Sequence, residues 1–558
     1  MNKKLCIYSG IFAALCAALF VSSMFINRAG FERIAYDSVF SYQIRQLAAL
    51  LLILLLGLLC QFTVNTMLSP QWSVLFALPT GICLWVFAGI LLLLTGVPFT
   101  FPATMAVVLV MLCLFYGLRR YFLPGKDRSV STTESLKKAL PLLLFFLGLV
   151  FFAASGFTYS FVSYDSFFYF INYGHTLTIL GNFRDIAGEN SFTLTNISQF
   201  LPLVHAYAAF WGLDQAYQIQ ALLSCNVLAA FFYGLYRFSA VIPVSAGEGI
   251  PALPRKKALL FSALFTFLLA SSTCFIVASS WVLANMYCMV YIFFLFLASL
   301  LLQHGECARY EGMILIAANF TALTLLRKDG IIFAAFFLIC FSSIRLLSKK
   351  HLALLFLPPS LAEIWWLFYV RVILDAGVSQ AVYTSIANNK NIFFIGLILA
   401  GSYAYLLFGH DLLKRIEKLT PRLPFLTEYS MILAGMFVLL CYSFVLKKDI
   451  IIDNMDFVIR NMFRYPSSWG ISALFFGVLI VWSVTVRIRL DYMHFLWIGY
   501  AFLNFVSYCI VDSKAFWLNW DDSYNRVLQQ IVPVFVLIMA LKSLALLQSD
   551  TPDHSSES

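Results

Sequence analysis

Charged residues are scarce in this chain. Only 11% of its 558 residues are Asp, Glu, Lys or Arg, against about 25% in soluble proteins, whereas 61% are hydrophobic. The hydrophobic residues form repeated runs that reach the roughly 17 to 25 residues an α-helix needs to cross a bilayer. This composition excludes a soluble globular protein and predicts an all-α, polytopic membrane protein.

Several kinds of site are also missing from the sequence. No CxxC pair or His-rich tract offers a metal site, and most of the twelve cysteines lie inside apolar runs as packing residues. No Gly-rich phosphate loop or soluble nucleotide-binding domain is present, so the chain has no obvious way to use ATP or a nucleotide sugar. We predict no cofactor and no nucleic-acid partner, despite the net charge of +10, and leave the metal requirement open.

The apolar runs define about sixteen candidate crossings. Four precede the first basic loop, at about 5–26, 47–68, 73–95 and 101–117. The others lie near 139–157, 216–236, 258–279, 281–303, 312–326, 331–347, 352–373, 392–409, 429–446, 468–486, 492–511 and 527–547. The first run lacks a small-residue cleavage site after it, so we expect a retained anchor rather than a cleaved signal peptide.

Basic residues predict the orientation in the membrane. The loop after the fourth crossing holds six Lys or Arg and only two acidic residues, so the positive-inside rule makes it cytoplasmic. Both termini are then cytoplasmic, and four later loops predicted to be cytoplasmic are also basic. Against this orientation, four basic residues fall outside: Lys447, Lys448, Arg460 and Arg464. We expect a multi-pass protein of the plasma (inner) membrane, in contact with its lipids.

The longest outer loop, 158–215, follows the fifth crossing. Its apolar stretch 200–213 is short and contains Pro202 and His205, so we expect an interfacial helix rather than a crossing. We interpret 1–128 as an N-terminal four-helix membrane region and 129–547, with this loop, as a second membrane region. The polar tail 548–558 is predicted to be disordered and cytoplasmic.

Asp165 is the most informative single residue. It follows the crossing at 139–157 within an aromatic stretch, YDSFFY at 164–169. A carboxylate where a membrane helix meets water suits chemistry on a lipid-linked substrate, although Asp165 could instead cap an interfacial helix. A similar stretch surrounds Asp37 in the first outer loop. Chance similarity in an aromatic-rich chain is the simpler explanation, and Asp37 remains a less favoured alternative to Asp165 as the functional carboxylate.

Four short pieces of the chain carry a family resemblance. They are YDSFFY at 164–169, QFLPLVHAY at 199–207, the crossing that ends in Tyr236-Arg237, and LLRKDG at 325–330. In this order they resemble the GT-C glycosyltransferases, such as the protein O-mannosyltransferases and the lipid A aminoarabinose transferase. The similarity covers roughly 138–350, and it implies a GT-C-like membrane fold with interfacial helices in the first large outer loop. It also implies that 129–547 is the catalytic region and 1–128 an accessory region.

The resemblance also implies a reaction. Such enzymes take a sugar from a polyprenyl-phosphate donor and transfer it at the extracytoplasmic face of the membrane. Asp165 would be the general base that accepts the proton of the acceptor hydroxyl, and an ordinary solvated aspartate is already ionised at neutral pH. One essential carboxylate implies single displacement with inversion. The acceptor is unknown: protein, lipid, wall polymer and surface glycan are all open.

The leaving phosphate needs fixed cations. Arg327 and Lys328, at the outer end of one crossing, are candidates, although both could instead reach lipid headgroups with Asp329 as a partner. Arg526, before the last crossing, is a third candidate, and it could instead pair with a neighbouring acid. Tyr164 and His205 are candidate substrate contacts. His205 could equally be a structural histidine that hydrogen-bonds to backbone or water.

The sequence departs from the family pattern at two places. No cation precedes the Pro-containing piece at 195–199, and Asn285 stands where relatives often carry an acid, which puts a second carboxylate and a bridging metal in doubt. Asp185 and Glu189 could substitute for that acid.

Three other classes stay open. A secondary transporter would show paired, interrupted crossings with polar groups at mid-membrane, which are scarce here. An O-antigen ligase or polymerase usually carries its large outer loop late in the chain, and a non-enzymatic scaffold would not need Asp165.

Overall fold

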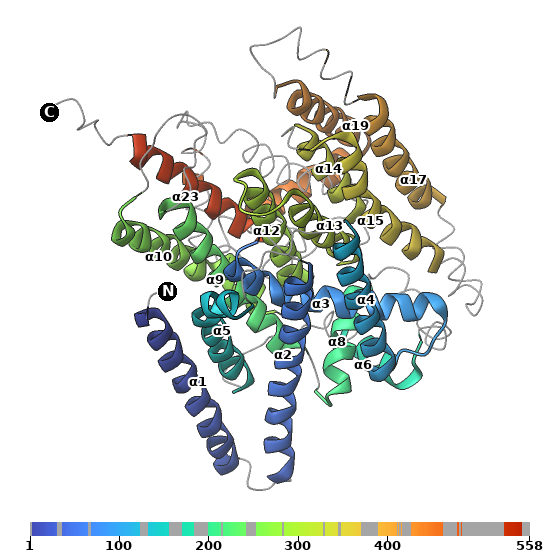
Figure 1. The fold of residues 1–558 in the computed structure, drawn as a ribbon. Coiled ribbons are helices and arrows are strands. Elements are labelled where there is room, and N and C mark those ends of the chain that lie inside the picture. Colours follow the sequence, from blue (N-terminus) through green and yellow to red (C-terminus); the bar gives the residue numbers. More distant parts are fainter. Residues whose placement is uncertain are drawn as a thin grey trace, which may run out of the picture. The chain divides into compact units, whose positions relative to one another are not determined.

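The chain, seen in a computed structural model, is built from α-helices (Figure 1). The structure describes residues 3–30, 36–64, 68–122, 132–155, 170–182, 199–213, 216–240, 253–281, 284–326, 330–343, 347–369, 389–409, 411, 415, 426–460, 477–478, 481 and 529–549. No β-strand occurs within these ranges, which confirms the all-α prediction for them.

The helices of the first half of the chain are α1 (Lys3–Gly30), α2 (Tyr36–Val64), α3 (Pro70–Thr95), α4 (Phe101–Phe122), α5 (Thr132–Ala154), α6 (Asn172–Leu180), α8 (Phe200–Phe210), α9 (Tyr217–Ala240), α10 (Arg255–Ser271) and α11 (Thr273–Ser280). The later ones are α12 (Ala284–Gln303), α13 (Arg309–Leu326), α14 (Gly330–Ser343), α15 (Lys349–Phe368), α17 (Asn389–Ala404), the π-helix η4 (Tyr405–Gly409), α19 (Leu426–Ile459) and α23 (Val532–Ser549).

The predicted crossings coincide with helices wherever the chain is described. The two at 468–486 and 492–511 fall almost entirely outside the described residues. By length and apolar character, seven of the described helices could cross a membrane, or eight if the bent pair α10 and α11 is one span. The structure therefore supports a polytopic membrane protein, and the predicted total of sixteen crossings is not confirmed.

Local chemistry explains several helix ends. α3 begins with Pro70, which has no backbone N–H to leave unpaired, after Ser69 in an extended conformation. It ends at Gly96, whose φ of 72° is left-handed and whose N–H caps the carbonyls of Leu92 and Leu93. The predicted single crossing at 258–279 is bent by 61° at Ser272, which is extended rather than helical.

The helices form two compact units. Unit 1 comprises Met1–Asn226, Ser280–Ala334 and Leu355–Leu399, and unit 2 comprises Val227–Ser279, Ala335–Leu354 and Ala400–Ser558. Within unit 1, α1 packs with α5, α2 with α3, α6 with α8, and α12 with α13. α3 also contacts α5 and α8, so helices on both sides of residue 128 share one unit, and the boundary at 128 stays a prediction. Within unit 2, α10 packs with α23.

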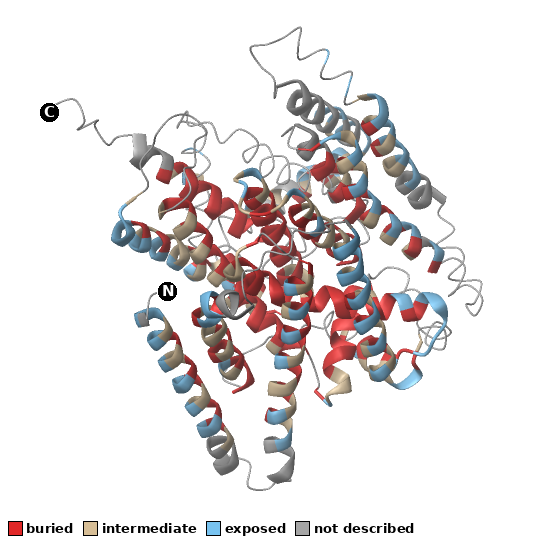
Figure 2. Ribbon diagram, in the orientation of Figure 1, coloured by how far each residue is buried: buried red, intermediate tan, exposed pale blue. Residues whose placement is uncertain are grey.

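Burial divides the helices of unit 1 into two kinds (Figure 2). α3 and α12 bury most of their side chains, among them Trp72, Trp85 and Tyr291. α1 and α4 instead expose apolar residues such as Leu15 and Leu114. A helix that is apolar all round belongs in a core, and a helix with an exposed apolar face suits contact with lipid. α3 and α12 are therefore internal, and α1 and α4 are peripheral.

Candidate functional site around the outer-loop helices

Two short helices of the predicted outer loop pack against each other. α6 has 9 residues and α8 has 11, so both are too short to cross a bilayer. They touch where Gly174 of α6 lies against the backbone of α8. A Cβ added at Gly174 would lie 2.6 Å from His205 Cβ and 2.8 Å from Ala206 N. The crossing of α6 and α8 therefore requires a residue without a side chain at Gly174.

The α8 helix is anchored to the first helices of the chain. The indole Nε1 of Trp85 in α3 donates to Leu203 O at 2.9 Å, and the hydroxyl of Tyr207 donates to Ala49 O in α2 at 2.6 Å. The rings of Phe99 and Phe210 pack around Trp85, with ring centroids 5.9 Å and 6.1 Å away. Such edge-to-face aromatic packing adds to simple burial. It holds α8 at the corner between α3 and α4.

α6 docks at the same corner. It ends at Gly181, whose φ is 72° and whose carbonyl accepts a hydrogen bond from Phe99 N at 2.7 Å. Both short helices are thus tied to the segment between α3 and α4. The described parts of the predicted outer loop 158–215 are therefore packed against other helices of unit 1.

His205 joins α8 to the start of α9. Its side chain is 2% exposed, and its Nδ1 accepts a hydrogen bond from Ala216 N at 3.2 Å. Burial, and secondly the neighbouring His175, lowers the pKa of His205 to about 3. The imidazole is therefore neutral at physiological pH and carries its proton on Nε2. The hydrogen bond from a backbone N–H to Nδ1 agrees with the alternative that His205 is a structural histidine. A contact between His205 and substrate stays a prediction.

α8 and α9 also contact the start of α12, where Asn285 lies. The amide of Gln220 donates to the carbonyl of Trp281. The ring of Phe200 packs against Tyr291 of α12, with centroids 5.5 Å apart. Gln220 of α9 and Phe200 of α8 therefore lie against Trp281 and Tyr291, which are far from them in sequence, within unit 1.

The start of α14 lies close to the last turn of α13. α13 ends at Leu326 and α14 begins at Gly330. A Cβ added at Gly330 would lie 2.6 Å from Leu323 O and would overlap the backbone of Thr324. α13 also contacts α8, so the crossing that precedes Arg327 packs against the Pro-containing helix.

The residues predicted to carry the chemistry lie outside the described part of the chain. These are Asp165, Tyr164, Arg327, Lys328 and Arg526, together with Asp329, Asp185 and Glu189. Their roles stay predictions. Of the predicted site residues, the structure describes His205 alone, together with the helices that flank the undescribed segments.

Sequence reasoning missed the burial of α8. We expected an interfacial helix, which has one polar face, but nine of its eleven residues are buried between α3, α6 and α13. The signal was present in the sequence, because FLPLVHAYAAF has no continuous polar face. A short helix that is apolar all round belongs inside the protein.

Two buried amide oxygens accompany these helices. Gln199 Oε1, just before α8, and Gln218 Oε1, in the first turn of α9, have no hydrogen-bond partner among the described residues. Buried polar atoms of this kind usually find a partner.

No group of three or more His, Cys, Asp or Glu suited to hold a metal occurs in the portion of the chain that the structure covers. Comparison of the chain with protein-family models, curated proteins and solved structures gives no match.

Proposed function

We propose that the chain is a membrane glycosyltransferase that moves one sugar from a polyprenyl phosphate to an acceptor at the extracytoplasmic face. The observation that carries the proposal is the contact between α8 and α13. Two of the GT-C-like pieces reach these helices: residues 200–207 belong to α8, and Leu325 and Leu326 end α13. Their packing within one unit supports a common site formed by segments that are distant in sequence.

The proposed chemistry is a single displacement. Asp165 accepts the proton of the acceptor hydroxyl while the hydroxyl oxygen bonds to the sugar C1. The bond from C1 to the phosphate oxygen breaks, and its electron pair leaves with the polyprenyl phosphate. Arg327 and Lys328, which follow α13, stabilise the charge that develops on this phosphate. Arg526 is a further phosphate or sugar contact, and Tyr164 and His205 line the substrate side.

The orientation follows from the basic loops. With α4 ending in Arg119 and Arg120 and α9 carrying Arg237 in its last turn, the positive-inside rule places these helix ends in the cytoplasm. The corner between α3 and α4, with α6 and α8 docked on it, then faces outward. An extracytoplasmic site suits a donor carried by a membrane lipid, because such a site does not require a soluble nucleotide sugar.

Glycan analysis of a deletion strain tests the proposal. Mass spectrometry of surface glycans and glycolipids should show one sugar missing from the deletion strain relative to its parent. The wild-type gene should restore the sugar. Asp165→Asn should fail to restore it, with a loss of about 10²- to 10⁴-fold in transfer, as expected when a general base is removed.

Asp37→Asn is the matched control, because Asp37 lies in the similar stretch YDSVF. It should restore the sugar as the wild type does, and both variants should reach the membrane at equal levels. Restoration by Asp165→Asn would remove Asp165 from the mechanism. Unchanged glycans in the deletion strain would refute the glycosyltransferase assignment.

A further inference from the structure

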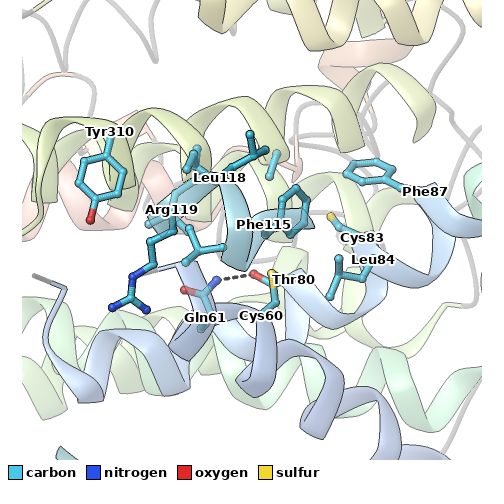
Figure 3. A pocket seen from close by; sticks show the side chains of 14 residues that line it. Cys60, Gln61, Thr80, Cys83, Leu84, Phe87, Phe115, Leu118, Arg119 and Tyr310 are labelled. Carbon is cyan, nitrogen blue, oxygen red and sulfur yellow. Dashed lines mark hydrogen bonds between the residues drawn. The ribbon is translucent and has the colours of Figure 1, made fainter. Parts of the chain in front are cut away.

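A cavity of about 560 Å³ lies in unit 1 between α2, α3, α4 and α13 (Figure 3). Its volume lies within the roughly 300 to 1,000 Å³ typical of small-molecule sites. No lining residue comes from α6, α8 or α12, so the cavity is separate from the proposed glycosyl-transfer site.

The walls of the cavity are almost entirely apolar. Two polar side chains on its surface are hydrogen-bonded within the protein. Gln61 Nε2 donates to Thr80 Oγ1 at 2.6 Å, and Thr80 Oγ1 donates to Phe76 O at 2.7 Å. The rest of the lining consists chiefly of aliphatic, aromatic and cysteine side chains. Such walls offer contact to a hydrocarbon chain and few hydrogen bonds to a polar ligand.

One end of the cavity carries a cation. Arg119 of α4 and Tyr310 of α13 line this end, and Phe87 of α3 lies at the other (Figure 3). Arg119 Nη1 donates to Thr63 O at 2.9 Å, in the last turn of α2. A guanidinium has five N–H donors in a planar fork, so contact with a helix carbonyl is compatible with contact to a phosphate.

The charged end lies at the predicted cytoplasmic side of the helices. α2 ends at Val64, α4 ends at Phe122, and α13 begins at Arg309. Anionic lipids of the cytoplasmic leaflet attract basic residues near the surface. Along α13 the lining runs from Tyr310 to Ala318, about 12 Å at 1.5 Å per residue. A chain whose headgroup lies at Arg119 would therefore run into the apolar part of the cavity.

We propose that this cavity binds an anionic phospholipid of the cytoplasmic leaflet, with one acyl chain in the apolar space and the phosphate paired with Arg119. The charge at one end and the apolar walls behind it match the two parts of such a lipid. The proposal does not rest on glycosyl transfer, and the two can fail independently.

Native mass spectrometry of the full-length protein released from nanodiscs tests the proposal. The nanodiscs would contain equal amounts of palmitoyl-oleoyl phosphatidylglycerol and phosphatidylcholine. The wild type should retain phosphatidylglycerol about fivefold over phosphatidylcholine, as one charge contact worth about 1 kcal/mol predicts. Arg119→Gln should abolish this preference, and Arg119→Lys should keep most of it.

Arg120→Gln is the charge-matched control, because Arg120 is exposed on the same helix and does not line the cavity. It should keep the preference. Ala318→Phe fills the cavity and should lower retention of both lipids at least fivefold, whereas Ala317→Phe, one residue outside the lining, should not. Thermal unfolding of each variant shows whether it is folded.

Three results would overturn the proposal. The first is equal retention of the two lipids by the wild type. The second is the same loss of preference in Arg120→Gln as in Arg119→Gln. The third is displacement of phosphatidylglycerol by added polyprenyl phosphate, which would assign the cavity to a prenyl lipid instead.

Discussion

Glu311, in the first turn of α13, joins two loops of unit 1. Its side chain is fully buried, and its Oε2 accepts hydrogen bonds from Leu68 N at 2.9 Å and from Ala308 N at 3.1 Å. Its Oε1 accepts a hydrogen bond from the hydroxyl of Tyr310, which lines the cavity, at 3.0 Å. We predict that Glu311→Ala releases both loops.

The stability lost in Glu311→Ala depends on how deeply each hydrogen-bond donor is buried. A buried N–H that loses its acceptor costs about 1 to 3 kcal/mol. The bond to Leu68 N is buried, but the bond to Ala308 N is only partly buried, so water replaces part of it. The Tyr310 hydroxyl can turn towards water and contributes little. The expected loss is about 2 to 4 kcal/mol.

Hydrogen exchange read by mass spectrometry at single-residue resolution measures this loss directly. Each tenfold change in the opening equilibrium corresponds to about 1.4 kcal/mol. Exchange at Leu68 N–H and Ala308 N–H should therefore accelerate by about 30- to 700-fold in Glu311→Ala. Glu311→Gln keeps one carbonyl acceptor and should show a smaller acceleration.

Glu306→Ala is the control, because Glu306 lies in the loop between α12 and α13 but does not accept from either amide. It should leave exchange at Leu68 unchanged. The reasoning would be refuted if Glu311→Ala left Leu68 as protected as in the wild type. It would also be refuted if Glu306→Ala had an equal effect.

Two further predictions concern the outer-loop helices. The pKa of His205 is about 3 in the folded protein against 6.5 as the reference, so its stabilising contribution is complete above pH 6.5. It is lost as the pH falls, by up to about 1.4 kcal/mol per pH unit, because only the unfolded chain binds the proton. His205→Asn retains an acceptor for Ala216 N–H without titrating, so its melting temperature should fall less between pH 7 and 5; an equal fall would contradict the assignment. Gly174→Ala should destabilise the protein by about 1 to 3 kcal/mol, because the added methyl group overlaps His205. Gly117→Ala in α4 is the control, since nothing lies within 4 Å of its added Cβ, and it should raise stability by up to about 1 kcal/mol. Equal melting temperatures for Gly174→Ala and the wild type would show that α6 can move away.

The helical segments could be predicted from runs of apolar residues, because a membrane helix leaves a local signal about twenty residues long. The bend at Ser272 could not be predicted in this way. The stretch 258–279 is apolar on average, although Ser271, Ser272 and Thr273 lie at the bend. A hydropathy average over about twenty residues does not register one extended residue within it.

The short helix expected at 200–213 is present as α8. The end of one helix at Leu326 and the start of the next at Gly330 also agree with the crossings predicted on either side of Arg327 and Lys328. The burial of that helix differed from expectation, because its partners lie in α3 and α13, which no local pattern of the 200–213 stretch identifies. Asp165 and the three candidate cations lie outside the described residues, so their arrangement stays a prediction.

Composition and the length of apolar runs were enough to establish an all-helical protein with several membrane-spanning helices, since the cost of exposing backbone polar groups to hydrocarbon leaves few alternatives. The packing of those helices required the three-dimensional arrangement. Leu68 and Glu311 are 243 positions apart yet share a hydrogen bond, and the cavity beside them is lined by four separate helices. Contacts of this kind depend on how helices approach one another, and the periodicity of any single helix does not encode that approach.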